Sequence, residues 1–265
     1  MPEQLSEHFI LLRGLTRESA HWGDFVPRLK AAFPHAKLTL LDLPGAGPYF
    51  REISPNTVNG ILEKVRTQAL EQSALGKPAT LIAISLGGMV GWEWLLSYPE
   101  EIGRAVLINI SLGGLSPFYH RLRWQCYSKL FAAAGNRNIE AREAGLLKLL
   151  SNREEHYQKT AADWIRIQKA RPVSGKNAYR QLYAAATYYP GNSKPTPPIL
   201  LLNSLGDKLV APCCSETIAQ KWQIELHTHS WGGHDLTLDD SEWVVTEIGG
   251  WGSTTPRPPD FGATE

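Results

Sequence analysis

The stretch ATLIAISLGG, residues 79–88, is the most informative part of the sequence for the fold. Its first six residues form a largely apolar run without alternating polarity, which is typical of a strand buried on both faces of a parallel sheet. Ser85 follows directly. Residues 86–97 are apolar nearly all round and predict a deeply buried helix. The stretch therefore predicts a strand, a tight turn at a serine and a helix.

Five further apolar runs extend this pattern along the chain. The additional strands are predicted at residues 8–12, 37–41, 105–110, 198–203 and 224–228. Additional helices are predicted at 56–72, 215–222 and 236–248. In the helix at 56–72 we expect Ile61, Leu62, Val65 and Leu70 to share one side. The alternation of strands and helices predicts an α/β fold: a doubly wound, mostly parallel sheet of about six strands flanked by helices.

Residues 112–190 interrupt this alternation because they contain no clear strand. They predict helices at 117–133, 139–150, 153–169 and 175–188. We interpret the segment as an all-helical lid inserted after the fourth strand, over the carboxyl edge of the sheet. The core would then comprise residues 1–111 and 191–251. Residues 252–265 are rich in Pro, Gly, Ser and Thr and are expected to form a disordered tail.

The composition excludes several classes of protein. A net charge of +1 in 265 residues gives no basic excess for a nucleic-acid partner. No apolar run approaches the roughly 20 residues that span a bilayer, and the N-terminus lacks the basic region of a signal peptide. The odd set of Cys126, Cys213 and Cys214, two of them adjacent, suits no disulfide framework and favours a cytoplasmic location. The sequence shows no sign of a cofactor and leaves the oligomeric state open.

Ser85 is the candidate nucleophile. A serine on a tight strand-to-helix turn is exposed, and such a turn needs small residues two positions before and after it, here Ala83 and Gly87. The Leu86 N–H opens the helix and would point at a developing oxyanion. The structural alternative is a glycine-rich packing turn.

Asp207 and His234 are the candidate partners of this serine. Asp207 follows the fifth apolar run, where a carboxylate can orient a histidine, although an Asx turn or a helix cap is the alternative. His234 follows the sixth run after two glycines, and histidine has a free pKa near 6.5, which suits a general base. The alternative is a satisfied loop histidine. His227 and His229 share one strand face, but no third metal ligand stands at a recognisable spacing, so no metal site is predicted.

The order Ser, Asp, His along the chain resembles the α/β-hydrolase family, in its compact esterase type with a single lid. The resemblance extends from about residue 9 to residue 248 and includes DLPGAG at 42–47, SLGG at 111–114 and GGHDLTLDDSEWV at 232–244. It implies that the Leu15 backbone N–H is the second oxyanion donor. It also implies a small-molecule ester or acyl substrate.

Two residues depart from the family's usual pattern. Ala83 stands where glycine is commoner, and Arg13 precedes Gly14 where the family more often has His-Gly. Arg13 would either bind an acidic substrate group or brace the loop through a salt bridge. We count Arg13, Gly14 and Trp124 as candidate substrate-pocket residues. Within residues 113–190, 13 basic residues stand against 5 acidic ones, which would favour anionic substrates or an acidic partner, or would form a solvated helical face.

The sequence thus predicts a serine hydrolase that cleaves a carboxylic ester through an acyl-enzyme on Ser85. A thioesterase or acyltransferase would use the same residues. A non-hydrolytic lyase or a ligand-binding protein could share the fold, since a fold does not fix a reaction. Cys126 and Cys214 are the alternative nucleophiles.

Overall fold

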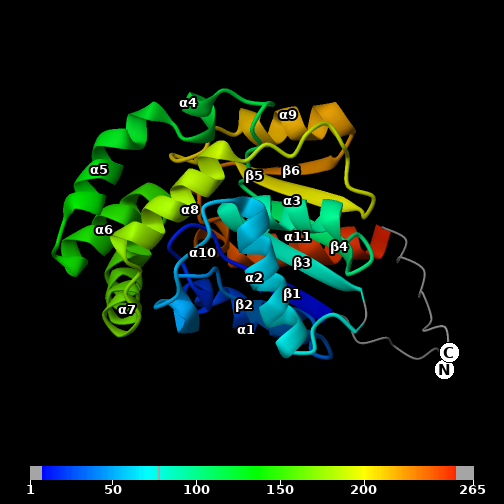
Figure 1. The fold of residues 1–265 in the computed structure, drawn as a ribbon, viewed down its shortest axis with the longest axis horizontal. Coiled ribbons are helices and arrows are strands. Elements are labelled where there is room, and N and C mark those ends of the chain that lie inside the picture. Colours follow the sequence, from blue (N-terminus) through cyan, green and yellow to red (C-terminus); the bar gives the residue numbers. More distant parts are fainter. Residues whose placement is uncertain (1–7, 77, 255–265) are drawn as a thin grey trace.

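The computed structural model describes residues 8–76 and 78–254 of the chain. Six parallel strands form one sheet in the order β2-β1-β3-β4-β5-β6 (Figure 1). The strands are β1 (His8–Leu12), β2 (Lys37–Leu41), β3 (Ala79–Ile84), β4 (Ile102–Ile108), β5 (Ile199–Ser204) and β6 (Glu225–His229). The predicted α/β class and doubly wound sheet are therefore confirmed.

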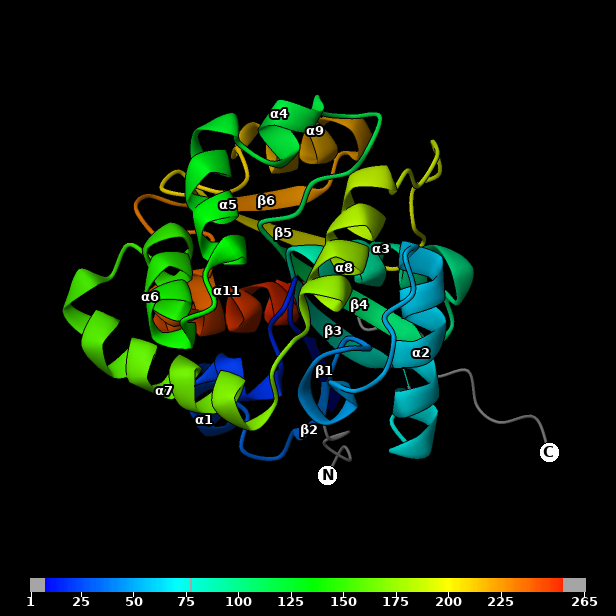
Figure 2. The same cartoon turned by 60° about the vertical axis from the view of Figure 1, so that its left-hand side comes forward.

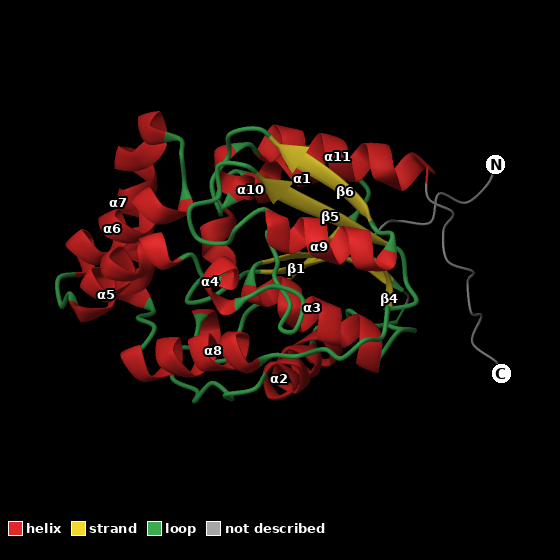
Figure 3. Cartoon of the chain, turned by 90° about the horizontal axis from the view of Figure 1, so that it is seen from above, coloured by secondary structure: helices red, strands yellow, loops and turns green. Residues whose placement is uncertain are grey.

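Helices cover both faces of the sheet (Figure 3), and the inner strands β1, β3, β4 and β5 are buried almost throughout, whereas the edge strands β2 and β6 are partly exposed. In β1, Ile10 and Leu12 join one core cluster, while Phe9 and Leu11 join the other. The first cluster packs against α2 (Val58–Glu71), α3 (Leu86–Ser97) and α9 (Cys213–Trp222). The second packs against α1 (Phe25–Ala32) and α11 (Ser241–Thr254). Two hydrophobic layers thus sandwich the sheet.

Several element boundaries differ from the sequence-based expectation. β4 ends at Ile108, because Asn109 takes a φ of 49° that a strand cannot continue. The expected last helix is split into α10 (Leu236–Asp239) and α11, and α11 continues to Thr254, into the expected tail. Residues 255–265 lie outside the described residues. Helix α1 was not expected at all.

One side-chain prediction in α2 is wrong. Leu70 is 52% exposed, whereas Ile61, Val65 and Ala69 are buried at the four-residue spacing of one helix face. Leu70 lies nine positions after Ile61, so the two lie on opposite sides of a helix with about 3.6 residues per turn.

The segment between β4 and β5 contains helices and short 3₁₀ turns, and lies at one end of the sheet (Figures 1 and 2). We call it the inserted helices: α4 (Phe118–Arg121), η3 (Trp124–Cys126), α5 (Tyr127–Gly135), α6 (Ile139–Leu150), η4 (Glu154–His156), α7 (Tyr157–Ala170) and α8 (Gly175–Thr187). The expected helix at 117–133 is broken, because Leu122 is extended and the Arg123 N–H bonds to the Leu209 carbonyl at 2.9 Å.

The strand order places the ends of β1 and β3 side by side. The chain builds the sheet outward from β1 in both directions, so the switch point lies between these strands. In open α/β sheets, ligands bind beside the carboxyl ends of the strands at such a point. Among the described residues, no helix has the length and apolar character needed to cross a bilayer.

Candidate active site

Ser85 stands on a strained turn between β3 and α3. Its backbone has φ 58° and ψ −123°, in the left-handed region that side chains with a Cβ rarely adopt. The Ser85 N–H donates to the Ile108 carbonyl at 2.9 Å, so the turn is tied to the end of β4. The side chain stays partly exposed although the residues around it are buried.

Gly87 allows α3 to approach β1 closely. A Cβ on Gly87 would lie 2.5 Å from the Arg13 carbonyl oxygen and 2.6 Å from that of Leu12. These distances exclude any side chain unless the backbone shifts. These two backbone oxygens explain why the residue two positions after the serine must be small.

The loop after β1 passes directly beside Ser85. A Cβ on Gly14 would lie 2.9 Å from the Ser85 Cβ and 3.5 Å from its hydroxyl oxygen. Leu15 follows on this loop, and the Thr16 N–H donates to Gln181 Oε1 of α8 at 2.9 Å. On the other side, the Leu86 N–H belongs to the first turn of α3, where N–H groups lack a carbonyl partner within the helix. Both backbone segments expected to hold an oxyanion therefore flank Ser85.

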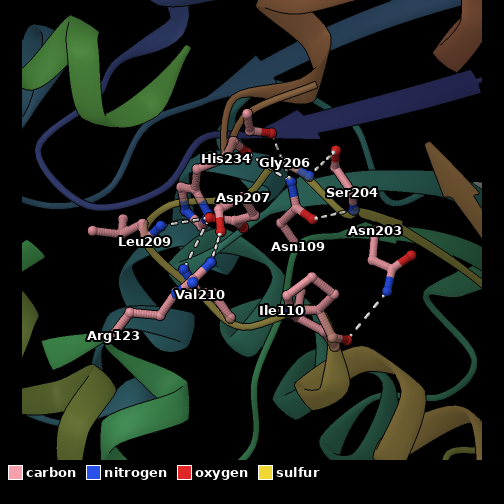
Figure 4. A network of polar contacts seen from close by, with 12 residues as sticks. Asn109, Ile110, Arg123, Asn203, Ser204, Gly206, Asp207, Leu209, Val210 and His234 are labelled. Atoms are coloured by element: carbon pink, nitrogen blue, oxygen red, sulfur yellow. Dashed lines mark hydrogen bonds and ion pairs between the residues drawn. The ribbon is translucent and has the colours of Figure 1, made fainter. Parts of the chain in front are cut away.

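Asp207 and His234 form a buried hydrogen-bonded pair (Figure 4). Asp207 Oδ2 lies 2.7 Å from His234 Nδ1. Asp207 Oδ1 accepts the N–H groups of Leu209 at 2.7 Å and Val210 at 2.9 Å. The carboxylate thus forms the Asx-type turn and orients the histidine at the same time.

The other ring nitrogen of His234, Nε2, bonds to none of the described residues. Nε2 is buried and has no hydrogen-bond partner within the described part of the chain. With Nδ1–H donated to Asp207, Nε2 carries the lone pair and can accept a proton. This is the chemical capacity that a general base needs.

Asn109 was not among the sequence candidates, and it joins three of the site's elements. Its Nδ2 donates to the His234 carbonyl at 2.9 Å, and its Oδ1 accepts the Ser204 N–H at 3.1 Å (Figure 4). It follows Ile108, whose carbonyl accepts the Ser85 N–H. The end of β4 therefore holds both the serine turn and the His234 loop.

Arg13 forms a buried ion pair with Asp235. Its Nη1 donates to Asp235 Oδ1 at 3.1 Å and to Thr237 Oγ1 at 3.2 Å, and its Nη2 contacts Asp235 Oδ2. Burial alone would raise the pKa of Asp235, but the Arg13 guanidinium and the bonds from Arg13 and Thr237 hold that pKa below its usual value. Arg13 is 2% exposed, and its charge is matched within the protein. Trp124, by contrast, is 64% exposed on η3.

The inserted helices are fastened to the loops that carry these residues. Arg123 Nη1 donates to the Asp207 carbonyl at 2.6 Å. Asp239 accepts the Ser151 hydroxyl and the Asn152 N–H from the inserted segment, together with the Gly233 N–H. Burial raises the pKa of this Asp239 carboxyl, although the three donors oppose the shift.

The structure gives little support to a cysteine nucleophile or to a metal site. Burial raises the pKa of the Cys126 thiol to about 11 and that of Cys214 to about 12, so neither thiol ionises readily near neutral pH. His227 lies between Glu225 and Glu247. Within residues 8–76 and 78–254, no group of three or more His, Cys, Asp or Glu side chains is arranged to hold a metal ion.

A doubly wound sheet with a strained serine turn and an Asp–His pair at the same edge is the arrangement of the α/β-hydrolase class. Residues 7–240 match the family described as alpha/beta hydrolase fold. The chain belongs to this family.

Curated relatives match a shorter stretch. A 2-hydroxy-6-oxononadienedioate/2-hydroxy-6-oxononatrienedioate hydrolase from Burkholderia vietnamiensis is 30% identical over 115 residues, which are 43% of this chain and 39% of the relative. A protein of the same name from Escherichia coli O81 is 27% identical over 119 residues, 43% of this chain and 40% of that one. The matches thus span about two fifths of these relatives' length.

Solved structures match nearly the whole chain. The esterase RhEst1 from Rhodococcus sp. ECU1013 has a TM-score of 0.76 at 15% identity, covering 95% of this chain and 92% of that one. The enol-lactonase from Burkholderia xenovorans LB400 has a TM-score of 0.72 at 15% identity, covering 96% and 94%. At this identity the likeness supports the fold.

Proposed function

We propose that this chain is a serine hydrolase that cleaves a carboxylic ester, or a related acyl bond, through an acyl-enzyme on Ser85. The proposal is supported by His234, whose Nδ1 bonds to Asp207 while Nε2 is buried and has no partner in the part of the chain that the structure describes. Asn109 ties the His234 loop to the end of β4, and the Ser85 turn is tied to the same strand end.

The proposed reaction uses these groups as follows. Ser85 Oγ attacks the substrate carbonyl carbon while His234 Nε2 accepts the hydroxyl proton. The Leu15 and Leu86 N–H groups stabilise the negative charge on the carbonyl oxygen, where one lost donor typically costs about 100- to 1000-fold in rate. His234 then gives the proton to the leaving group. Water, activated by the same nitrogen, cleaves the acyl-enzyme, and Asp207 stabilises the imidazolium in both steps.

The known relatives support an enzyme of this kind, because the family and its named members include hydrolases and an esterase. We take the substrate to be a small molecule. We also propose a cytoplasmic location, because Cys126, Cys213 and Cys214 are all free thiols in the structure.

The test is hydrolysis of a panel of p-nitrophenyl esters, with one thioester, by the native protein and by Ser85→Ala. We expect hydrolysis of at least one ester and a loss of about 10⁴-fold or more in kcat for Ser85→Ala. A fluorophosphonate probe should label the native protein and not this variant. Ser111→Ala is the matched control, because Ser111 is fully buried beyond β4 with no bond to its hydroxyl among the described residues, and it should keep full activity. Labelling or turnover that survives Ser85→Ala would refute the proposal.

A further inference from the structure

Helix α8, the last of the inserted helices, packs against the core through one face. Asn177, Gln181 and Ala184 are buried, and the buried Tyr188 follows directly after the helix. Their spacing of three to four residues places them on one side of a helix. Ala184 and Tyr188 join the core cluster that packs against α2 and α3. The two amide side chains instead bond to backbone groups of core loops.

Gln181 joins the loops that follow β1 and β2. Its Oε1 accepts the Thr16 N–H at 2.9 Å, and its Nε2 donates to the Pro44 carbonyl at 3.1 Å. The Gln181 side chain is fully buried, so water does not compete for either bond. One loop offers a backbone donor and the other a backbone acceptor, so the two bonds fix which end of the amide faces which loop.

The Thr16 N–H belongs to the turn that carries the proposed oxyanion donor. The Arg17 N–H donates to the Gly14 carbonyl at 3.2 Å, which closes a four-residue turn with Leu15 and Thr16 at its centre. Thr16 has a φ of 58°, in the left-handed region that favours glycine or asparagine at the third position of such a turn. A β-branched residue keeps this conformation only where its surroundings hold it.

The bond from Thr16 to Gln181 selects this form of the turn. The bond between Arg17 and Gly14 does not select it, because that bond is compatible with either orientation of the central peptide. The Thr16 N–H is part of the central peptide, so its acceptor determines the orientation. Without that acceptor, the peptide can turn over, Thr16 can relax to negative φ, and the neighbouring Leu15 is displaced.

We propose that Gln181 is a positioning residue for the oxyanion hole, because it holds the turn in the form that directs the Leu15 N–H at the developing negative charge. This inference rests on the proposed function of Ser85 and Leu15. The turn begins beside the nucleophile, since a Cβ on Gly14 would lie 2.9 Å from the Ser85 Cβ. The inserted helices would thus contribute to the catalytic geometry through α8.

The test compares the native protein, Ser85→Ala and Gln181→Met on the best p-nitrophenyl ester. Methionine keeps the length of the side chain and removes both bonds. We expect kcat to fall about 10- to 100-fold with KM changed by less than about twofold, because the hole stabilises charge that appears only in the transition state. Gln168→Met is the matched control. Gln168 is buried on α7 and accepts the Val173 N–H at 3.3 Å within the inserted helices, so kcat should be unchanged.

A pair of substrates separates positioning from a general loss of structure. In a thionoester, sulfur replaces the carbonyl oxygen, and sulfur is a weak hydrogen-bond acceptor, so the oxyanion hole contributes less. Gln181→Met should therefore lower kcat/KM for the ester at least about fivefold more than for the matching thionoester, whereas loss of folded protein lowers both equally. Gln181→Asn is the second variant. It keeps the amide but is one methylene shorter, and it should show the same selective loss.

A rescue variant tests the role of the turn directly. Glycine takes a positive φ without strain, so the turn can keep its form without the bond to Gln181. Thr16→Gly/Gln181→Met should therefore recover at least about threefold in kcat over Gln181→Met.

The possible failures are distinguishable. Turnover that does not depend on Ser85 would refute the proposed function, and this inference with it. If turnover depends on Ser85, either of two results would overturn the role of Gln181 alone: unchanged kcat in both Gln181 variants, or equal losses on the ester and the thionoester. A loss in Gln168→Met as large as in Gln181→Met would also overturn it, because the effect would then come from packing of the inserted helices.

Discussion

The buried ion pair between Arg13 and Asp235 joins the loop after β1, which passes beside Ser85, to the loop that carries His234. Arg13 precedes Gly14 on the loop after β1, and Asp235 follows His234 directly. A shift of one loop therefore moves the other. In the proposed mechanism, the oxyanion donor at Leu15 and the base at His234 are kept in register by this pair.

Removing one partner of the pair should be costly. Arg13→Met leaves the Asp235 carboxylate buried and uncompensated, and we expect a loss of about 3–5 kcal/mol in unfolding free energy. Arg13→Met/Asp235→Leu should recover much of that loss, because neither charge remains. Urea unfolding at pH 7 measures both. Asp235→Leu alone completes the comparison: if its loss and that of Arg13→Met simply add in the double variant, the two residues are not coupled.

The acid stability of the protein should depend on His21. Burial, together with the nearby Arg17 and Arg13 guanidinium groups, holds the pKa of His21 well below its usual 6.5. Below pH 6.5 the unfolded chain therefore binds a proton that the folded chain refuses, and stability falls as the pH decreases, by up to about 1.4 kcal/mol per pH unit. His21→Asn should flatten the dependence of unfolding free energy on pH between 6.5 and 5. The exposed His156→Asn is the control and should leave the slope as in the native protein.

Asp207→Asn should lower kcat by about 10⁴-fold, because an amide N–H facing Nδ1 selects the imidazole tautomer that cannot accept the serine proton. Initial rates on the best p-nitrophenyl ester report this loss. Asp240→Asn is the comparison, since Asp240 contacts another histidine, His229, at 3.3 Å. If kcat falls equally in both variants, Asp207 is not the residue that orients the catalytic histidine.

Asn109 is expected to act as a positioning residue. Asn109→Asp keeps the size of the side chain and tolerates the left-handed backbone, but it replaces the donor to the His234 carbonyl with an acceptor. A displacement of the base by about 1 Å can cost about 100-fold in rate, so kcat should fall by about that factor with little change in KM. Asn203→Asp removes a similar buried donor, to the Pro212 carbonyl, and should preserve kcat. A variant that changes KM alone would contradict the positioning role.

Gly87→Ala should destabilise the protein by about 1–3 kcal/mol, because the new methyl group meets two backbone oxygens that cannot move away freely. Gly145→Ala is the matched change in α6, where no described residue outside the helix's own backbone lies within 4 Å of the added Cβ. The unfolding free energy of that variant should rise by roughly 0.5–1 kcal/mol, because alanine has a higher helix propensity than glycine. Thermal unfolding of both variants gives the comparison.

Much of the fold was predictable because the inner strands are buried on both faces, and largely apolar runs such as 8–12 and 79–84 mark them directly. Helix α1 was missed because its eight residues, FVPRLKAA, bury only Phe25 and Leu29 and include a proline. The break at Leu122 depends on a bond between Arg123 and Leu209, 86 positions apart in the chain. Local patterns carry no record of such a contact.

In the candidate site, too, some residues could be predicted from local patterns and others depend on contacts distant in the chain. Ser85, Asp207 and His234 each follow an apolar run, so their position at one sheet edge was predictable. Asn109 also ends such a run, but an asparagine there has no signature until its partners are known. For Arg13 the sequence allowed either a substrate contact or a salt bridge, and Asp235 supplies the partner for the latter.

The pair of Arg17 and Glu143 sets a condition on exchanging parts with relatives. Arg17 belongs to the core loop after β1 and Glu143 to α6, and the two meet at 2.7 Å with 4% and 1% of their side chains exposed. A chimera that receives another hydrolase's inserted helices would lose Glu143, and the buried Arg17 guanidinium would then have no carboxylate partner there. Grafts made at residues 112 and 190 alone should therefore express poorly, and recombination that carries residues 13–22 along with the helices should succeed more often.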